Sequence, residues 1–340
     1  MKTTQGGQPT SELRHPFSST VKNNFIYDFY LEDSIAACFS NAVGFIPAKT
    51  SIHCSNTARE PSDSPIWMIQ NVPSYLEITK SELSPKWGRK EIKQYKGYAL
   101  RLSDYTSADA FIGTQLSSRN RRKLRSKLGK LEKTGKIEYH FYYGSVSWSE
   151  HVERFDKFYD MLKRRFDEIK LSNRNLFHWA FFCMNSYQLI IEKRAFLFVV
   201  EKDGVPIAFS LNYLRGNLCF GIFQTHDIQY NAFNLGDICM LKKLEWFYGQ
   251  GVVFYDLSMG LNYFKEKWAD YEYTFYHILF HRYSFPGRSK AFFLENALRF
   301  RQWLRYKGII GNLINLDKLL YNRNARKLES FDWKSGLENN

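Results

Sequence analysis

Downstream of residue 135, hydrophobic and polar positions follow two periods in turn along the chain. Apolar residues at every second position predict β-strands, whereas apolar residues three or four positions apart predict helices. The turns Lys202-Asp203-Gly204 and Arg215-Gly216-Asn217 predict that three successive strands pair antiparallel, because Gly adopts a positive φ at low cost. The expected strands are 136–143, 196–201, 205–214, 218–226, 252–258 and 273–282, and the expected helices are 149–169, 176–193, 236–248 and 262–269.

These elements follow one another as strand, helix, helix, three strands, helix, strand, helix and strand. The helix at 236–248 connects the strand at 218–226 to the strand at 252–258, and such a crossover predicts that the two strands run parallel. The first turn of a helix also has backbone N–H groups without an acceptor inside the helix. We therefore expect an anion site where the strand at 218–226 leads into the helix, beside the second strand.

The first 135 residues have a less regular pattern. We expect strands at 25–31, 66–70 and 98–102 and a short helix at 73–83. Residues 1–23 are rich in Ser, Thr, Gly and Gln, which predicts a disordered segment.

A basic helix is predicted at 117–134. Its Leu124, Leu128 and Leu131 lie four and three positions apart and form one apolar stripe on an otherwise basic rod. Gly135 is expected to end the helix.

The formal charge of +14 is concentrated in two segments. Residues 119–136 carry nine Lys or Arg and one acidic residue, and residues 288–327 carry ten and two, so each segment has a net charge of +8. The remainder of the chain has a net charge of −2. Local positive charge predicts RNA, an acidic membrane surface or a phosphorylated substrate as a neighbour, and the alternative is a solvated face without a partner.

The C-terminal region 289–320 is expected to form two helices, in which aromatic and basic residues are mixed. This mixture is typical of a helix on an acidic bilayer surface. The alternative is a helix packed on the body of the protein, with its basic side in solvent.

The chain has 340 residues, of which 44% are hydrophobic, and this length predicts about two domains. No apolar run reaches the roughly 18 residues that a spanning helix needs, and residues 1–20 lack the apolar core of a signal peptide. The five cysteines are scattered without a CxxC spacing, which predicts neither a disulfide framework nor a zinc site. We expect no bound metal, and a protein in the cytoplasm or at the periphery of the inner membrane face.

Two sequence segments carry a resemblance to a known family. Phe233-Asn234-Leu235-Gly236, directly before a helix, resembles the donor-phosphate loop of the Gcn5-related N-acetyltransferases. The run Tyr255 to Gly260, followed by Tyr263-Phe264-Lys265 and Trp268, resembles the signature of CelD-type acetyltransferases of cellulose biosynthesis and of FemA/B/X-like peptidoglycan aminoacyltransferases. The resemblance implies an α/β fold of two acetyltransferase-like domains in tandem (FemX-like), with mixed central sheets flanked by helices and a helical C-terminal extension.

On this basis the chain divides into five parts, and the N-terminal acetyltransferase-like domain is expected to be a degraded copy of the C-terminal one. The five parts are a disordered N-terminus (1–23), an N-terminal acetyltransferase-like domain (24–116), a basic linking helix (117–136), a C-terminal acetyltransferase domain (137–285) and a basic helical extension (286–340).

The resemblance implies transfer of an acyl group from acetyl-CoA or another acyl-CoA to an amine or hydroxyl of a sugar or cell-envelope precursor. Because no Ser-His-Asp order and no Cys-His pair is evident, we expect direct transfer in a ternary complex. One alternative is a FemX-like transferase that uses aminoacyl-tRNA, with the basic helix on the RNA. Another is a non-catalytic module that binds a membrane surface.

The donor phosphates are expected at the start of the helix near residue 236. Asn234, Leu235, Gly236 and Asp237 would hold them through backbone N–H groups. The alternative is an ordinary helix start capped by the side chain of Asn234 or Asp237.

The candidate catalytic residues are Lys265, Asp256, His226 and Tyr263. The resemblance implies that Lys265 stabilises the oxyanion of acyl transfer and that Tyr263 protonates a leaving thiolate. Asp256 could act as a general base, orient Lys265, or form a structural ion pair with Lys265 or Lys267. His226 could act as a base near neutral pH, or could simply be hydrogen-bonded at a strand end.

The acceptor is expected to bind beside the same cleft. Asn212 and Tyr213 lie in the middle of a predicted strand, and Gln224 shares a strand face with His226. We expect these three side chains to contact the acceptor.

Overall fold

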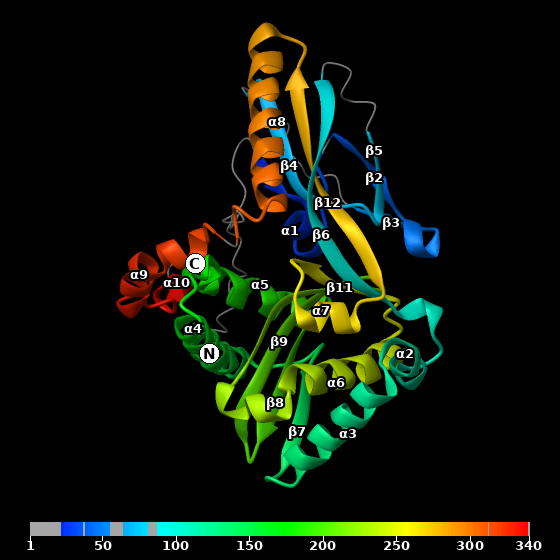
Figure 1. Ribbon diagram of the computed structural model, residues 1–340, viewed down its shortest axis with the longest axis vertical. Helices are drawn as coiled ribbons and strands as arrows, with labels where there is room; N and C mark the ends of the chain where they lie inside the picture. The colour runs from blue at the N-terminus through cyan, green and yellow to red at the C-terminus, as the bar shows by residue number, and fades with distance from the viewer. Residues whose placement is uncertain (1–21, 37, 55–63, 81–86, 312, 339–340) are drawn as a thin grey trace, which may run out of the picture.

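The computed structural model describes residues 22–36, 38–54, 64–80, 87–311 and 313–338. Within these ranges the chain forms a mixed nine-stranded sheet, a separate three-stranded sheet, and helices on both faces of the large sheet (Figure 1). The predicted α/β fold class, with a large mixed sheet flanked by helices and a helical C-terminal extension, is confirmed. Residues 1–21 of the predicted disordered segment lie outside the described residues.

The nine strands of the large sheet are named here in their spatial order. They are β1 (Lys22–Asn24), β4 (Ile66–Pro73), β12 (Tyr271–Arg282), β6 (Trp87–Arg101), β11 (Phe254–Met259), β10 (Leu218–His226), β9 (Val205–Arg215), β8 (Ala195–Lys202) and β7 (Ile137–Tyr142). The small sheet has the order β3 (Thr50–His53), β2 (Phe39–Phe45) and β5 (Leu76–Lys80).

The helices differ widely in length, from single turns to 22 residues. The α-helices are α1 (Phe25–Tyr30), α2 (Ala108–Gln115), α3 (Ser118–Glu132), α4 (Trp148–Glu168), α5 (Trp179–Ile191), α6 (Leu235–Gln250), α7 (Tyr263–Trp268), α8 (Phe285–Tyr306), α9 (Leu316–Glu329) and α10 (Ser335–Glu338). The 3-10 turns are η1 (Ile46–Ala48), η2 (Leu102–Asp104), η3 (Arg174–His178) and η4 (Ile228–Phe233).

From β7 to β12 the predicted elements are confirmed in type and order, with ends that differ by a few residues. The turn between β8 and β9 places Asp203 and Gly204 at φ angles of 52° and 78°, which is the conformation that an Asp-Gly pair predicts. Ser147 caps α4 by accepting a hydrogen bond from the N–H of Glu150. In α3, Leu124 and Leu131 are buried as the apolar stripe predicts.

In the first third of the chain the strand expected at 66–70 is found as β4, two predictions are wrong, and one strand is longer than predicted. Residues 25–31 form the helix α1 rather than a strand, and Asn24 starts it by accepting from the N–H of Ile26. Within 73–83 the structure has the strand β5, not a helix. The short strand expected at 98–102 is the end of the 15-residue strand β6.

The helices divide the core into two main clusters, one on each face of the large sheet (Figure 1). One cluster includes residues of α1, α4 and α5 together with the small sheet. The other includes residues of α2, α3, α6 and α7. A third, smaller cluster joins α8 to β4, β6 and β12. None of the described helices combines the length and the apolar character that crossing a membrane requires.

Strand β12 joins the two predicted domains through backbone hydrogen bonds. It pairs antiparallel with β4 on one side and with β6 on the other, although it follows all other strands in sequence. Strand β6 also pairs with β11. The predicted domains therefore share one continuous sheet, and their exact boundaries stay a prediction.

Candidate active site between two diverging strands

A cavity opens where β10 and β11 separate. The two strands pair parallel, as predicted, but only over Leu218–Phe220 and Phe254–Asp256. Beyond this point they enclose a volume of about 460 Å³. The lining residues come from both strands and from helices on both faces of the sheet: Arg165, Ser210, Gly221, Ile222, Phe223, Gln224, His226, Gly236, Tyr255, Leu257, Ser258, Met259, Asn262, Phe264 and Lys265.

Both strands are distorted beside this cavity. The register of β10 against β9 shifts between Gly221 and Phe223, and that of β11 against β6 shifts between Asp256 and Met259. Such bulges bend a strand and release its pairing. A Cβ atom on Gly221 would lie 2.8 Å from the hydroxyl oxygen of Tyr255, so glycine leaves the room in which the Tyr255 side chain packs against β10.

The start of α6 faces the cavity. Asn234 has φ +55° and makes no side-chain capping bond, so the alternative of a helix start capped by Asn234 is not observed. Gly236 lines the cavity, and a Cβ atom added there would lie 3.7 Å from the ring of Phe264. The N–H groups of Asn234 and Asp237 already donate to the carbonyls of Asn231 and Asn234, so of the four predicted residues Leu235 and Gly236 are the ones whose N–H groups can face the open space. This arrangement suits an anion.

The other residues of the predicted donor loop shape the helix start. The side chain of Leu235 is fully buried. Asp237 accepts hydrogen bonds from Nζ of Lys267 at 2.5 Å and from Nε1 of Trp268 at 2.8 Å. These contacts turn its carboxylate toward α7 and balance its charge, which removes the repulsion that Asp237 would exert on a phosphate.

Lys265 lies in the cavity wall at the start of α7. Asn262 caps this helix by accepting from the N–H of Lys265, and Nζ of Lys265 donates to the carbonyls of Ser258 at 3.1 Å and Met259 at 2.5 Å. Burial lowers the pKa of Lys265 to about 8, against the favourable charge of Asp256. The ammonium group has a third N–H, which these carbonyls leave available.

Asp256 lies behind the cavity wall rather than in it. Its carboxylate is fully buried and accepts from the hydroxyls of Tyr75 at 2.8 Å and Tyr273 at 2.6 Å, and from the N–H of Ser258 at 2.6 Å. Burial raises the pKa of Asp256 to about 6, although these hydrogen bonds oppose the shift. Asp256 does not line the cavity, so a role as a base in contact with substrate stays a prediction that this position does not favour.

The bond from Asp256 to Ser258 stabilises an unusual backbone conformation. Ser258 has φ +66°, a left-handed conformation that non-glycine residues rarely adopt. The carboxylate of Asp256 holds the N–H of this residue, and the carbonyls of Ser258 and Met259 then reach Nζ of Lys265. Of the predicted roles of Asp256, orientation of Lys265 is the one that this geometry fits.

His226 lines the cavity at the end of β10. Its Nδ1 lies 3.2 Å from an Nη atom of Arg165, and its Nε2 lies 3.0 Å from Oδ1 of Asn231. The guanidinium can only donate, so Nδ1 accepts and Nε2 donates, which describes a neutral imidazole. Burial, and then the charge of Arg165, lower the pKa of His226.

Of the remaining predicted site residues, one lines the cavity and the others lie outside its lining. Gln224 lines the cavity as expected. Tyr263 is 71% exposed and Tyr213 is fully buried, and neither belongs to the cavity lining. Asn212 is buried one layer behind the wall, where its Oδ1 accepts from the hydroxyl of Tyr255 at 3.0 Å. Neither Asn212 nor Tyr213 lines the cavity, and the predicted roles of Asn212, Tyr213 and Tyr263 stay predictions.

Lys243 is a site residue that the sequence analysis missed. It is fully buried in α6, and its Nζ donates to the hydroxyl of Tyr255 at 2.7 Å, Oε1 of Gln224 at 3.1 Å and Oγ of Ser210 at 3.3 Å. All three partners line the cavity. No carboxylate among the described residues pairs with Lys243, and burial lowers its pKa to about 8.

The comparison with protein families concerns this part of the chain. Residues 118–266 match the family described as acetyltransferase (GNAT) domain. This segment is similar to a GNAT domain. Arg165, His226, Gly236, Lys243 and Lys265 all belong to it. The search of curated proteins found no similar sequence.

Solved structures are similar to the chain at low sequence identity. FemX is 11% identical, with 62% of this chain and 72% of that one covered and a TM-score of 0.45. L-PGS from Bacillus licheniformis is 14% identical, with coverage of 65% and 69% and a TM-score of 0.42. The PaiA N-acetyltransferase from Thermoplasma acidophilum, in complex with coenzyme A, is 13% identical, with coverage of 34% and 75% and a TM-score of 0.28.

The matched segment 118–266 does not form the surroundings of the cavity alone. Tyr75 and Tyr273, which hold the carboxylate of Asp256, lie outside residues 118–266. Strand β6, which pairs with β11 next to the cavity, also lies outside this range. The site therefore depends on residues from both predicted domains.

Proposed function

We propose that the protein transfers an acyl group from an acyl-CoA, with acetyl-CoA as the expected donor, to an amine or hydroxyl of a sugar or cell-envelope precursor. The observation that carries this proposal is the cavity between β10 and β11, with the start of α6 beside it. A donor that joins a thioester to a pyrophosphate fits a cavity that has backbone N–H groups at one end and buried cations along its wall. The loop and signature residues support the CelD-type or FemA/B/X-like branch of the superfamily.

In this proposal the N–H groups around Gly236 bind the pyrophosphate of the donor. The ion pair between Asp237 and Lys267 keeps the carboxylate away from it. The thioester then reaches the part of the cavity between Lys265 and the hydroxyl of Tyr255, which Lys243 polarises.

The transfer itself needs stabilisation of negative charge on the thioester oxygen. The third N–H of Lys265 donates to this oxygen as the acceptor nitrogen or oxygen attacks the carbonyl carbon. The carbonyls of Ser258 and Met259 fix the direction of the ammonium, so little reorganisation is needed. The carbon–sulfur bond then breaks and the thiolate leaves with the donor.

The acceptor approaches from the side of α4, where Arg165 and His226 line the cavity. Neutral His226 takes the proton of the acceptor when Arg165 moves from Nδ1. Because the nucleophile is the acceptor itself, no covalent intermediate on the protein is required.

A thermal-shift series tests the proposal. We expect acetyl-CoA or a longer acyl-CoA to raise the melting temperature, because a ligand present at about 100 times its Kd stabilises the folded state by about 2.7 kcal/mol. S-acetyl-N-acetylcysteamine, a thioester without phosphates, should give no shift at the same concentration. If no acyl-CoA shifts the melting temperature, the proposal is wrong.

The basic face of α3 favours a second candidate, a transferase that uses aminoacyl-tRNA. Nζ of Lys127 hydrogen-bonds the carbonyl of Ala232 in η4, so α3 lies against the loop that leads into α6. The exposed cations of α3 and the following turn are Arg119, Arg122, Lys123, Arg125, Lys130, Lys133 and Lys136.

In this second candidate the basic face contacts the phosphate backbone of a tRNA, and the aminoacylated end of the tRNA enters the cavity. Titration with tRNA at two salt concentrations separates the candidates. Several phosphate contacts predict a steep loss of affinity with salt, and Arg122→Glu/Lys123→Glu should weaken the binding. Tight acyl-CoA binding without RNA binding would favour the first proposal.

A further inference from the structure

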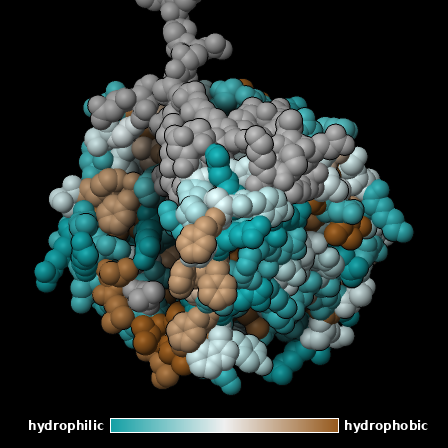
Figure 2. All heavy atoms as spheres, turned by 90° about the horizontal axis from the view of Figure 1, so that it is seen from above, coloured by the Kyte–Doolittle hydropathy of each residue, from teal (hydrophilic) through white to brown (hydrophobic). Residues whose placement is uncertain are grey.

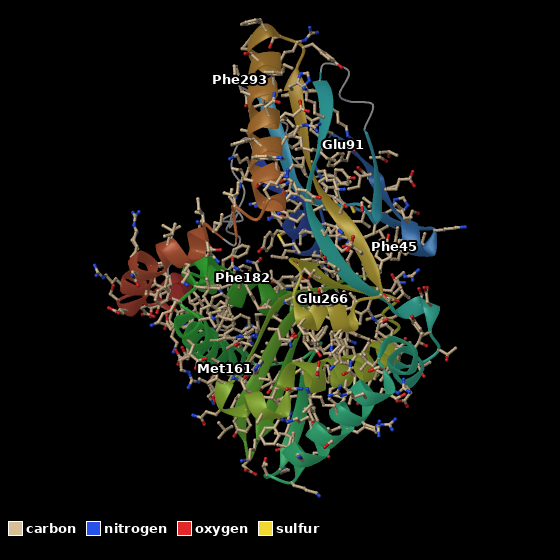
Figure 3. The ribbon with its side chains drawn as sticks, viewed as in Figure 1. Phe45, Glu91, Met161, Phe182, Glu266 and Phe293 are labelled. Carbon is tan, nitrogen blue, oxygen red and sulfur yellow. The ribbon has the colours of Figure 1, made fainter. Side chains whose placement is uncertain are left out.

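The outer side of α8 exposes a row of large aromatic side chains. These are Phe285, Phe292, Phe293, Phe300 and Trp303, and Phe285 and Phe293 are 86% and 69% exposed. Their spacing along 22 residues places them on one side of the helix. Figure 3 labels Phe293 on this helix, and Figure 2, seen from the end where α8 begins, shows aromatic rings at the surface beside hydrophilic side chains.

The opposite side of α8 is already used by the fold. Ala291 is buried, and Leu294 and Leu298 pack with it against a cluster that contains Ile92 and Leu279. The aromatic row therefore does not face the core of the described chain. An apolar stripe of this length in solvent is unfavourable for a protein that has no other surface to cover it.

The aromatic row is flanked by positive charge. Between residues 285 and 307 there are six cations and a single acid, Glu295. The cations are Arg288, Lys290, Arg299, Arg301, Arg305 and Lys307. Arg305 lies over the ring of Tyr95 on the body of the protein, whereas the other five are exposed. Glu295 is neutralised by Lys90 at 2.5 Å and by Arg299 at 2.9 Å.

We propose that α8 binds the surface of an anionic lipid bilayer, lying in the plane of the headgroups. The aromatic side chains would enter the boundary between headgroups and acyl chains, and the flanking cations would contact lipid phosphates. The net positive charge of residues 285–307 favours this partner, because an excess of cations around exposed aromatic rings complements an acidic membrane rather than a neutral one. The inference goes beyond acyl transfer and does not depend on it.

Vesicle flotation with the full-length protein tests the proposal. We expect binding to vesicles of phosphatidylcholine with phosphatidylglycerol, and binding at least about tenfold weaker to phosphatidylcholine alone. Phe293→Ser/Phe300→Ser should weaken binding to the anionic vesicles by about tenfold or more, because it removes apolar contact. Arg288→Glu/Lys290→Glu should weaken it to a similar degree.

The matched control is Arg122→Glu/Lys123→Glu on α3, which changes the net charge by the same amount on exposed residues. It should retain binding within about twofold of the wild-type protein. Equal melting temperatures of all variants exclude unfolding as the cause. Absence of vesicle binding, binding that survives both α8 variants, or an equal loss in the α3 control would each overturn the proposal.

Discussion

Lys243 and Lys265 bring two ammonium groups to one cavity, and burial lowers the pKa of each to about 8. A buried ammonium group that forms no ion pair reduces the stability of the folded state. Lys243 is such a group, and the charge of Asp256 compensates Lys265 only in part, so we propose that both bind negative charge in the cavity.

Lys243→Met tests this role at the residue scale. Methionine fills a similar volume without a charge, so the melting temperature should stay equal or rise, whereas affinity for an acyl-CoA should fall by about tenfold or more. The control is Lys242→Met, which removes a half-buried lysine that pairs with Glu245 and lies over the ring of Tyr139, away from the cavity, and it should change neither quantity much. A lower melting temperature with unchanged donor affinity would assign Lys243 to structure alone.

The pKa of Asp256 leads to a prediction about stability and pH. The pKa is about 6 in the folded protein and 3.8 for an ordinary carboxyl, so the folded state binds the proton more tightly. The free energy of unfolding should therefore fall as pH rises from about 4 to about 6 and should be independent of this group above that range. The size of this component is about 3 kcal/mol.

Urea unfolding of wild-type protein and Asp256→Asn at pH 4 and pH 7 measures this component. Relative to the wild-type protein, the variant should gain about 3 kcal/mol between the two pH values, because it lacks the ionising group. A relative loss by the variant would mean that Asp256 is stabilised as an anion, for example by Lys265.

Individual site residues were predictable where the pattern of apolar and polar positions predicted both a helix or strand and the position of its end. Gln224, His226, Gly236 and Lys265 lie at the strand and helix ends that the crossover predicts, and they line one cavity. Lys243 was missed because a lysine in a helix is usually solvated. Its position four residues after Cys239 and four before Phe247, on the buried side of α6, was the available signal.

At the scale of elements, the packing of the Tyr255 side chain of β11 against β10 depends on Gly221. Gly221→Ala would place a methyl group 2.8 Å from the hydroxyl of Tyr255, which in turn holds Lys243. We expect a loss of about 1–3 kcal/mol in stability, as in other overpacked sites, together with weaker donor binding. Chemical denaturation and a donor titration measure the two effects.

The control for this variant is Gly129→Ala in α3, where an added Cβ atom meets nothing within 4 Å. Alanine inside a helix should raise stability by about 0.5–1 kcal/mol and leave donor binding unchanged. If both alanine variants behave alike, the narrow approach at Gly221 has no structural importance.

The elements after residue 135 were predictable because their apolar positions keep one period and their turns carry Gly or Asp-Gly. In the first third, α1 was mispredicted and most of β6 was missed, for physical reasons that differ between the two elements. Helix α1 is buried on nearly all sides, so its aromatic residues show no helical period. Strand β6 contains several Lys, Arg and Glu, which disfavour strands, and it forms because β11 and β12 pair with both of its edges.

At the scale of the whole molecule, β12 determines how the two halves behave. Pairing between strands distant in sequence cannot be read from local periodicity, and the insertion of β12 between β4 and β6 was accordingly not predicted. Because Tyr75 and Tyr273 hold Asp256, this pairing also completes the surroundings of the cavity.

A shared sheet predicts that the two halves unfold together. Equilibrium denaturation followed by far-ultraviolet circular dichroism and by tryptophan fluorescence should give coincident single transitions. Addition of an acyl-CoA should move both curves together. Two separated transitions would mean that the predicted domains are independent in spite of their common sheet.

The central claim is that the first turn of α6 binds the phosphates of a donor in the cavity between β10 and β11. Calorimetric titration of acetyl-CoA into the wild-type protein, Gly236→Ala and Gly236→Pro tests it most directly. Alanine keeps the N–H and has room, since its Cβ atom would lie 3.7 Å from Phe264, so it should bind like the wild-type protein. Proline removes the N–H and should weaken binding by about tenfold or more while the protein stays folded. Equal affinity of all three proteins, or no binding by the wild-type protein, would contradict the account.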